Sequence, residues 1–220
     1  MKNAIVEGNK KMEKLYKYPR TFHFPWSETV ASDDRVLTDI SCFVGSEIVV
    51  TEKMDGENCS MYRDYIHARS VDGLSHPSRA WVKNMWADIR YDIPVGWRIC
   101  GENLYAKHSI NYKDLKSYFY GFSIWNENNV CLSWDETIEW FELLGIVHVP
   151  VLYRGKFDVD ILKNLSINKD KQEGYVVRHA CSFRYDEFKN RVAKFVRSNH
   201  VKTDEHWMHK EIEKNLLIGE

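Results

Sequence analysis

The sequence has no long apolar segment. None of its apolar runs approaches the ~18 residues needed to cross a bilayer, which argues against a membrane-spanning helix. The first residues, Met1 to Lys14, are polar and lack the apolar centre of a secretion signal. From these two absences we expect a protein of the cytoplasm that has no membrane partner.

Cysteine pairs are also missing. The five cysteines form no Cys-x-x-Cys pair and their number is odd, which argues against a disulfide framework and a thiolate zinc site. The sequence contains no internal repeat, low-complexity tract or linker rich in proline, glycine and serine. With 44% hydrophobic and 29% charged residues, the 220 residues are sufficient for a buried core. We therefore expect residues 1–220 to form one domain.

Net charge is nearly absent, because 31 basic residues stand against 32 acidic residues. Affinity for a polyanion would therefore have to come from local clusters. Basic residues cluster at residues 1–20 and 178–202, whereas residues 117–153 contain no lysine or arginine and are acidic. Taken alone, these clusters are most simply explained as solvated faces of unrelated elements.

Strand patterns outnumber helix patterns. Residues 59–70 are typical of a hairpin, and further runs rich in β-branched and aromatic residues predict strands at 48–53, 97–105, 118–125, 147–153, 174–178 and 192–196. Helical spacing of apolar residues predicts helices at 78–90 and 203–217. Ser133 and Glu136 form a capping box for a helix that Gly145 can end. The expected fold class is α+β, with antiparallel sheets and flanking helices.

One lysine stands where a strand meets a turn. Lys53 follows an apolar strand and precedes Asp55 and Gly56, and glycine permits a tight turn or close approach to a ligand. A lysine amine is a nucleophile only when neutral, so its ordinary pKa of about 10.4 must be lowered by burial or by cations. We expect this of Lys53. Lys-x-Asp-Gly alone is short enough to occur by chance, and an exposed turn is the alternative.

Five further motifs follow Lys53-Met54-Asp55-Gly56 along the chain. They are Arg69-Ser70, Gly101-Glu102-Asn103, Phe122-Ser123-Ile124, Glu173-Gly174-Tyr175-Val176-Val177-Arg178 and Val192-Ala193-Lys194-Phe195-Val196-Arg197. In content and order the six motifs resemble those of the covalent nucleotidyltransferases, which are ATP-dependent RNA ligases, DNA ligases and mRNA capping enzymes. Asn58, five positions after the lysine, is typical of RNA ligases, and residues 192–209 resemble the compact bacterial and phage RNA ligases.

The resemblance implies a nucleotidyltransferase domain and a reaction in three steps. Lys53 attacks the α-phosphorus of ATP and expels pyrophosphate, AMP then moves to an RNA 5′-phosphate, and a 3′-hydroxyl finally displaces AMP to close a phosphodiester. Charge accumulates on phosphoryl oxygens, so cations and a divalent metal, Mg2+ or Mn2+, should stabilise each step. The implied partners are ATP and RNA ends with a 5′-phosphate and a 3′-hydroxyl, and we expect a monomer.

The resemblance also implies roles in catalysis and metal binding. Lys53 is the nucleophile, and Asp55 orients it or holds metal-bound water. Asn58 lies near the phosphates, although asparagine is also common in turns for local reasons. Arg69 contacts AMP and the end being joined, or else forms a surface salt bridge. Glu173, at the start of an apolar strand, provides oxygen ligands for the metal.

Nucleotide-binding roles are implied for a second group. Glu52 contacts the adenine edge, and Glu102 accepts a hydrogen bond from the ribose. Phe122 stacks on adenine, although without the motif order a core residue would be the better interpretation. Lys194 lies in an apolar strand, where an unpaired ammonium is costly, so we expect a phosphate partner. Arg197 takes the place of a second lysine that many relatives carry one position earlier.

Only a short segment follows Lys194, whereas larger ligases carry a C-terminal domain that grips nucleic acid. We expect a helical tail without such a domain, weak binding to isolated RNA and a preference for pre-organised ends. For His200, His206 and His209 a zinc site would need a further ligand; contact with phosphate or nucleic acid is the alternative, and the sequence does not decide between them. The alternatives are a DNA ligase, another lysine nucleotidyltransferase, or a non-catalytic RNA-binding relative.

Overall fold

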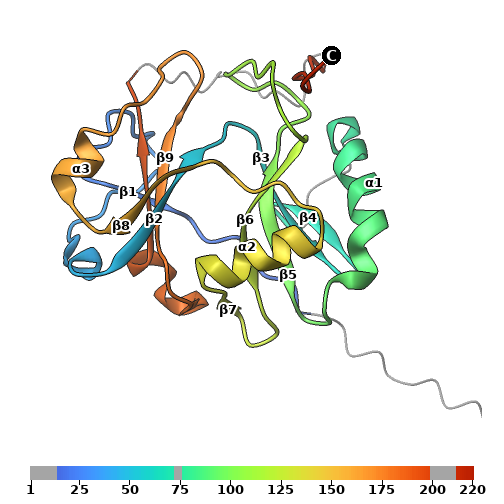
Figure 1. Cartoon of the computed structure of the whole chain (residues 1–220), viewed down its shortest axis with the longest axis horizontal. Coiled ribbons are helices and arrows are strands. Elements are labelled where there is room, and N and C mark those ends of the chain that lie inside the picture. Colours follow the sequence, from blue (N-terminus) through green and yellow to red (C-terminus); the bar gives the residue numbers. More distant parts are fainter. Residues whose placement is uncertain (1–13, 72–75, 199–211) are drawn as a thin grey trace, which may run out of the picture.

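The computed structural model describes residues 14–71, 76–198 and 212–220. These residues form two mainly antiparallel β-sheets with few helices, which confirms the α+β class (Figure 1). Helix α3 (Val159–Lys163) lies beside one sheet and helix α1 (Ala80–Ile89) beside the other, so the two sheets face each other across the middle of the molecule. No helix among the described residues has the length and apolar character that crossing a bilayer requires.

The first sheet has five strands. Their order is β1 (Phe22–His23), β11 (Val192–Val196), β9 (Gly174–His179), β2 (Glu47–Lys53) and β8 (Val151–Lys156). Strand β1 pairs with β11 in parallel and the other neighbours are antiparallel. Apolar side chains alternate between the two faces, because successive residues of a strand point to opposite sides. On β2, Ile48 and Val50 pack on the α3 side, whereas Val49 packs between the sheets.

The second sheet has six strands, all antiparallel to their neighbours. Their order is β10 (Phe183–Arg184), β7 (Val130–Cys131), β6 (Phe119–Trp125), β5 (Arg98–Asn103), β3 (Glu57–Tyr62) and β4 (Ile66–Ala68). The hairpin predicted at residues 59–70 is confirmed as β3 and β4. The outer face of this sheet is covered by α1 and by α2 (Trp134–Leu143).

Helix α2 begins where the capping box predicts. The Ser133 hydroxyl accepts a hydrogen bond from the Glu136 backbone N–H, and the Glu136 carboxylate accepts one from the Ser133 N–H at 2.9 Å. Two otherwise unpaired donors of the first turn are satisfied in this way. Gly145 follows the helix with a φ of 65°, a left-handed conformation that glycine adopts at no steric cost. Short 3-10 helices occupy Ser41–Phe43, Pro77–Arg79, Arg90–Asp92 and Tyr185–Asn190.

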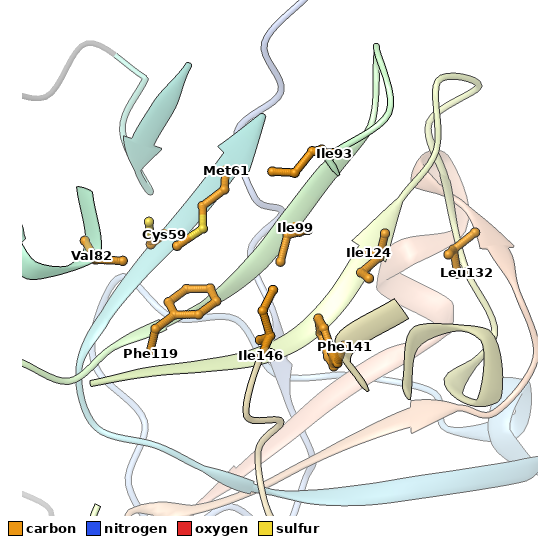
Figure 2. Packing of buried hydrophobic residues seen from close by; sticks show 10 residues of the cluster. All are labelled: Cys59, Met61, Val82, Ile93, Ile99, Phe119, Ile124, Leu132, Phe141 and Ile146. Carbon is orange, nitrogen blue, oxygen red and sulfur yellow. The ribbon is translucent and has the colours of Figure 1, made fainter. Parts of the chain in front are cut away.

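The core of the second sheet lies between its strands and helices α1 and α2 (Figure 2). Met61, Ile99 and Ile124 project from β3, β5 and β6 and are almost completely buried. Val82 of α1 and Phe141 of α2 complete the cluster. Burial of each apolar side chain of this size stabilises the fold by about 1.5–3 kcal/mol. This layer therefore holds β3, β5 and β6 in place, and the opposite face of these strands is turned toward the first sheet.

Two predicted elements differ from the structure by more than two residues. The strand predicted at 147–153 begins only at Val151, because residues 147–149 first pair with Gly121 of β6 in the other sheet. Pro150 lacks a backbone N–H and stands where the chain crosses between sheets. The helix predicted at 203–217 lies outside the described residues up to residue 211. Residues 212–217 are not helical, and pair instead with Ala106 and Leu115.

Candidate active site

A cleft of about 840 Å³ lies between the two sheets, and strands of both sheets line it. The lining includes side chains on the face of each sheet that is turned toward the other sheet, such as Lys53 on β2 and Lys194 on β11. Nine of the ten predicted site residues line this cleft: Glu52, Lys53, Asp55, Asn58, Arg69, Glu102, Phe122, Glu173 and Lys194. Segments separated by more than a hundred residues therefore meet in one place. Arg197 is not among the lining residues.

Lys53 ends strand β2 beside the motif that starts β9. The backbone of Lys53 pairs with Gly174, and its Nζ atom lies 2.5 Å from Oε2 of Glu173. Glu173 is only 5% exposed, so this ion pair lies below the surface of the cleft. Gly174 is required here, since a Cβ atom at this position would overlap the carbonyl oxygen of Phe195 on β11. The Glu-Gly pair thus lets two strands approach closely next to the lysine.

Burial and charge act in opposite directions on Lys53. Burial alone would lower its pKa, but the Glu173 and Glu102 carboxylates outweigh burial and raise the pKa above its ordinary value. The amine is therefore a cation at neutral pH in this structure. The expectation that its surroundings lower the pKa is wrong, because the neighbouring charges are carboxylates and their attraction for the ammonium exceeds the desolvation penalty.

Glu102 shows the complementary effect. It lies on β5 opposite Asn58 of β3, and burial raises its pKa to about 8, with Glu173 and Asp55 adding to the rise. Lys53 acts in the other direction on Glu102. Three carboxyl groups thus lie near the Lys53 ammonium, and with a pKa of about 8 the Glu102 carboxyl is mainly protonated at neutral pH. A cation or a hydrogen-bond donor bound next to Glu102 would favour its ionised form.

A divalent metal fits this chemistry through few protein ligands. Among residues 14–71, 76–198 and 212–220, no three His, Cys, Asp or Glu side chains are grouped so that they could hold an ion. Mg2+ commonly takes one or two carboxylates, with water and phosphate oxygens completing its shell. Glu173, a buried carboxylate at the cleft, is an oxygen donor of that kind.

Asp55 is held by the loop that follows β5. Its Oδ2 atom accepts hydrogen bonds from the Ser109 backbone N–H at 2.8 Å, the Ser109 hydroxyl at 2.6 Å and the Ile110 backbone N–H at 2.8 Å. The backbone N–H of Asp55 donates to the hydroxyl of Tyr112 at 3.0 Å. The carboxylate is 8% exposed and its orientation is therefore set by residues 109–112.

Asn58 and Arg69 reach the cleft from the second sheet. The Oδ1 atom of Asn58 is buried and has no hydrogen-bond partner among the described residues. An unpaired buried oxygen is costly, and such a group is a candidate ligand-binding atom. Arg69 directly follows β4, is exposed, and lines the cleft. A guanidinium in this position can contact an anion that enters from solvent.

Lys194 has a protein partner that the sequence analysis missed. Its Nζ atom lies 3.3 Å from Oδ1 of Asp34, and Oδ2 of Asp34 lies 3.1 Å from Nε2 of His23. Burial and the charge of Lys53 lower the pKa of Lys194, while Asp34 opposes this. Neither Asp34 nor His23 belongs to a recognisable motif. Only the parallel pairing of β1 with β11 brings His23 beside Lys194.

Aromatic rings form one end of the cleft. Phe122 of β6 and Val176 of β9 line it from opposite sheets and pack against the same buried cluster. Tyr18 lies edge-on to Phe122, with ring centroids 5.1 Å apart, and burial raises its pKa. Tyr18 precedes the first strand and follows no periodic pattern, so no sequence signal identified it. The apolar side chains of Phe122 and Val176 on the lining are suited to contact a flat, apolar group.

Glu52 and Arg197 are connected through Gln172. The Gln172 side-chain amide donates to Oε2 of Glu52 at 2.9 Å, and burial raises the pKa of this carboxyl. Arg197 donates to the backbone carbonyls of Gln172 at 2.7 Å and Ser198 at 2.9 Å. Its guanidinium therefore supports the segment before Glu173, and its expected role in place of a second lysine stays a prediction.

The described residues of the basic cluster at 178–202 are divided between the interior and the surface of the protein. Arg178 is buried and donates to the carbonyl oxygen of Leu132 at 2.6 Å. Arg184 pairs with Asp186, and Arg191 pairs with Glu187. Residues 1–13 of the other cluster lie outside the described residues, as do His200, His206 and His209.

Ligases are among the solved structures that share this fold. The Naegleria gruberi RNA ligase with pyrophosphate gives a TM-score of 0.56 at 21% identity, over 89% of this chain and 61% of that chain. A variant of that ligase with ATP and Mn gives 0.51 at 18%, over 72% and 52%. An Aquifex aeolicus protein assigned as an ATP-dependent DNA ligase gives 0.53 at 20%, over 84% and 50%. Such identities show a shared fold, and this chain spans only about half to three fifths of those proteins.

Sequence comparison is more specific. Curated proteins give no match to this chain. A family model described as RNA ligase, however, matches residues 46–196, which is more than half of the chain. The match begins just before the strand that ends at Lys53 and finishes at the strand that carries Lys194, so it includes all nine predicted residues that line the cleft. The chain therefore belongs to the RNA ligase family.

Proposed function

We propose that this chain is an ATP-dependent RNA ligase that joins 5′-phosphate and 3′-hydroxyl RNA ends through a lysyl-AMP intermediate on Lys53. Membership of the RNA ligase family supports the class of reaction. The observation that carries the proposal is the position of Lys53, whose amine lies 2.5 Å from Glu173 in a cleft lined by Glu102 and Lys194. The family neighbours solved with ATP and Mn, and with pyrophosphate, are consistent with these ligands.

ATP would bind with its base at the aromatic end of the cleft and its phosphates toward Lys194. Phe122 and Val176 would hold the two faces of adenine, and Glu52 would contact its edge. Glu102 would meet the ribose hydroxyls, which can donate hydrogen bonds to a carboxylate. Lys194 would exchange its ion pair with Asp34 for a phosphate oxygen.

The nucleophile must lose a proton before it reacts. Lys53 is a cation in this site, and the Glu173 carboxylate at hydrogen-bond distance would pass its proton on to water. The Nζ lone pair then forms a bond to the α-phosphorus while the bond to pyrophosphate breaks. Bound Mg2+ or Mn2+ would supply positive charge to the phosphoryl oxygens. Glu173 is the residue that would hold it.

The RNA steps would use the part of the cleft nearest the second sheet. Arg69 is exposed there and can meet the 5′-phosphate of the strand that receives AMP. The Asn58 side chain, whose Oδ1 lacks a partner among the described residues, can hydrogen-bond to the reacting groups. A 3′-hydroxyl then attacks the 5′-phosphorus, AMP leaves, and the phosphodiester is complete.

The test is the intact mass of the protein after exposure to ATP and Mg2+. We expect the mass to rise by one AMP in the wild type and not in Lys53→Ala or Lys53→Arg, of which the second keeps a cation beside Glu173. Labelling of either variant at the wild-type rate would disprove the role of Lys53. GTP in place of ATP should give no adduct, and GTP labelling would contradict the adenine assignment.

Sealing assays then identify the nucleic acid. The proposal predicts that the protein seals a 5′-phosphate to a 3′-hydroxyl on RNA strands at least tenfold faster than on DNA strands of the same sequence. A preference for DNA would replace the RNA ligase proposal with DNA ligase activity. RNA binding without any lysyl-AMP would indicate a non-catalytic relative.

A further inference from the structure

Residues 212–220, here called the strap, lie across the loop of residues 104–118. Asn215 N–H donates to the carbonyl of Tyr105 at 3.0 Å, and Leu216 N–H donates to the carbonyl of Tyr112 at 2.9 Å. In the other direction, Lys107 N–H donates to Glu213 at 2.8 Å. Isolated bridges join Ala106 to Lys214 and Leu115 to Leu217. The two segments thus pair at both ends of the loop.

Asn215 is the centre of this contact. It is completely buried, and its side-chain amide donates to the carbonyl of Leu104 at 2.7 Å. Its Oδ1 atom accepts from the backbone N–H of Tyr112 at 2.9 Å, so one side chain holds two separate points of the loop. The hydroxyl of Tyr118 also donates to the Asn215 carbonyl at 2.9 Å. The Asn215 side chain thus donates one hydrogen bond and accepts another at two separate points of the loop. Alanine could form neither bond, so this contact depends on the amide.

The opposite side of the same loop holds Asp55. Ser109 and Ile110 give three hydrogen bonds to Oδ2 of Asp55, and Tyr112 accepts one from its backbone N–H. Residues 107–114 contain no helix or strand, so the loop has little regular structure of its own to hold these donors. Tyr112 is the direct link, since Asn215 binds its backbone N–H and Asp55 binds its hydroxyl.

We propose that the strap is a positioning element for the nucleophile segment. The strap fixes residues 109–112, and these residues orient the Asp55 carboxylate. Because Asp55 lies two positions after Lys53, this contact holds the segment that carries the nucleophile in place. Asn215 and Tyr112 are therefore positioning residues for the first chemical step, although neither has a place in the six motifs. This inference rests on the proposed lysine chemistry for its kinetic part only.

The kinetic test compares Asn215→Ala with Glu213→Ala under single-turnover conditions at saturating ATP. Asn215→Ala should lower the rate constant of lysyl-AMP formation by about tenfold to a hundredfold, because a small misplacement of reacting groups is that costly. The ATP concentration for half-maximal rate should stay within about twofold. Glu213 also belongs to the strap, and Glu213→Ala removes only its exposed ion pair with Lys107 of the loop. This variant should react like the wild type.

A purely stabilising strap would give a different result. It would lower the amplitude of labelling, which counts folded molecules, and leave the rate constant unchanged; that outcome would overturn the proposal. Should Asn215→Ala fail to fold, Tyr112→Phe carries the test, since it keeps the ring and removes only the hydroxyl bonded to Asp55. An unchanged rate constant in Tyr112→Phe would then be the contradiction.

Hydrogen exchange tests the structural half without ATP. The backbone N–H groups of Ser109 and Ile110 donate to Asp55, so they should exchange at least tenfold faster in Asn215→Ala than in Glu213→Ala. Equal protection in the two variants would refute the strap as the element that fixes this loop. A wild type that forms no lysyl-AMP would refute the proposed function, while the exchange result would still decide the role of the strap.

Discussion

At the scale of single residues, the site depends on how carboxylates surround one amine. Lys53 is partly buried, which by itself favours the neutral form, yet Glu173 and Glu102 hold it as a cation. The same contacts raise the question of how the proton leaves, since only the neutral amine attacks phosphorus. A change in the charge of Glu173 therefore has a direct effect on the reactivity of Lys53.

Replacing Glu173→Gln separates these effects. The amide keeps the shape and removes the charge, so the pKa of Lys53 should fall and its neutral fraction at pH 8 should rise. Competitive labelling with a small amine reagent, followed by peptide mass analysis, should show faster reaction of Lys53 than in the wild type. Adenylylation by ATP should nevertheless fall by at least about a hundredfold if Glu173 holds the metal. Exposed Glu142→Gln is the control, and slower labelling of Lys53 in Glu173→Gln would contradict this account.

At the scale of elements, the close approach of β9 and β11 places Glu173 beside Lys53. Gly174 and Phe195 meet so tightly that only glycine fits at the first of these positions. The motif Glu-Gly thus has a packing reason as well as a chemical one. Tyr175 and Val177 on the other face of β9 belong to the buried cluster under α3, so the strand cannot shift outward to make room.

Gly174→Ala should therefore destabilise the protein. We expect a loss of about 3 kcal/mol in the free energy of unfolding, measured by urea denaturation, because the added methyl overlaps backbone atoms that cannot move freely. Gly45→Ala is the matched control. Gly45 has a φ of 76° but no atom within 4 Å of its Cβ position, so only the backbone cost of about 1 kcal/mol applies. Equal losses in the two variants would show that the contact with Phe195 is unimportant.

At the scale of the whole molecule, buried titratable groups link stability to pH. His179 is 1% exposed, packs against Phe43, and accepts a hydrogen bond from Arg191. Burial, together with Arg191 and Arg178, lowers its pKa to about 4 from the ordinary 6.5. The unfolded chain therefore binds more protons than the folded chain between these two values. Stability from this group is complete above pH 6.5 and is lost as the pH falls toward 4.

The free energy of unfolding should consequently fall by up to about 3 kcal/mol between pH 6.5 and pH 4 on account of His179. Urea denaturation of the wild type and of His179→Gln across this range measures the difference, because glutamine does not titrate. The difference in the free energy of unfolding between the wild type and His179→Gln should become smaller as the pH falls. A gap that is constant with pH would mean that His179 keeps its ordinary pKa in the folded protein.

The strand and helix predictions were most accurate where local chemistry decides. The run that ends at Lys53, the hairpin after it and the capping box of Ser133 and Glu136 are all confirmed, because alternation and capping act within a few residues. Nine of the ten residues chosen from the motifs line one cleft, and their roles there stay predictions. The start of β8 and the segment 212–217 were wrong, since their backbone partners lie far away in the chain.

Composition and local pattern were thus enough to predict the class of fold, and the resemblance of six ordered motifs to those of known ligases indicated the family. Only the folded chain decided that Lys53 is a cation, that Asp34 and His23 stand behind Lys194, and that Asn215 supports Asp55. The physical reason is separation: these contacts join residues as many as 160 positions apart. Burial and Coulomb energy depend on distances in space, which a local pattern does not contain.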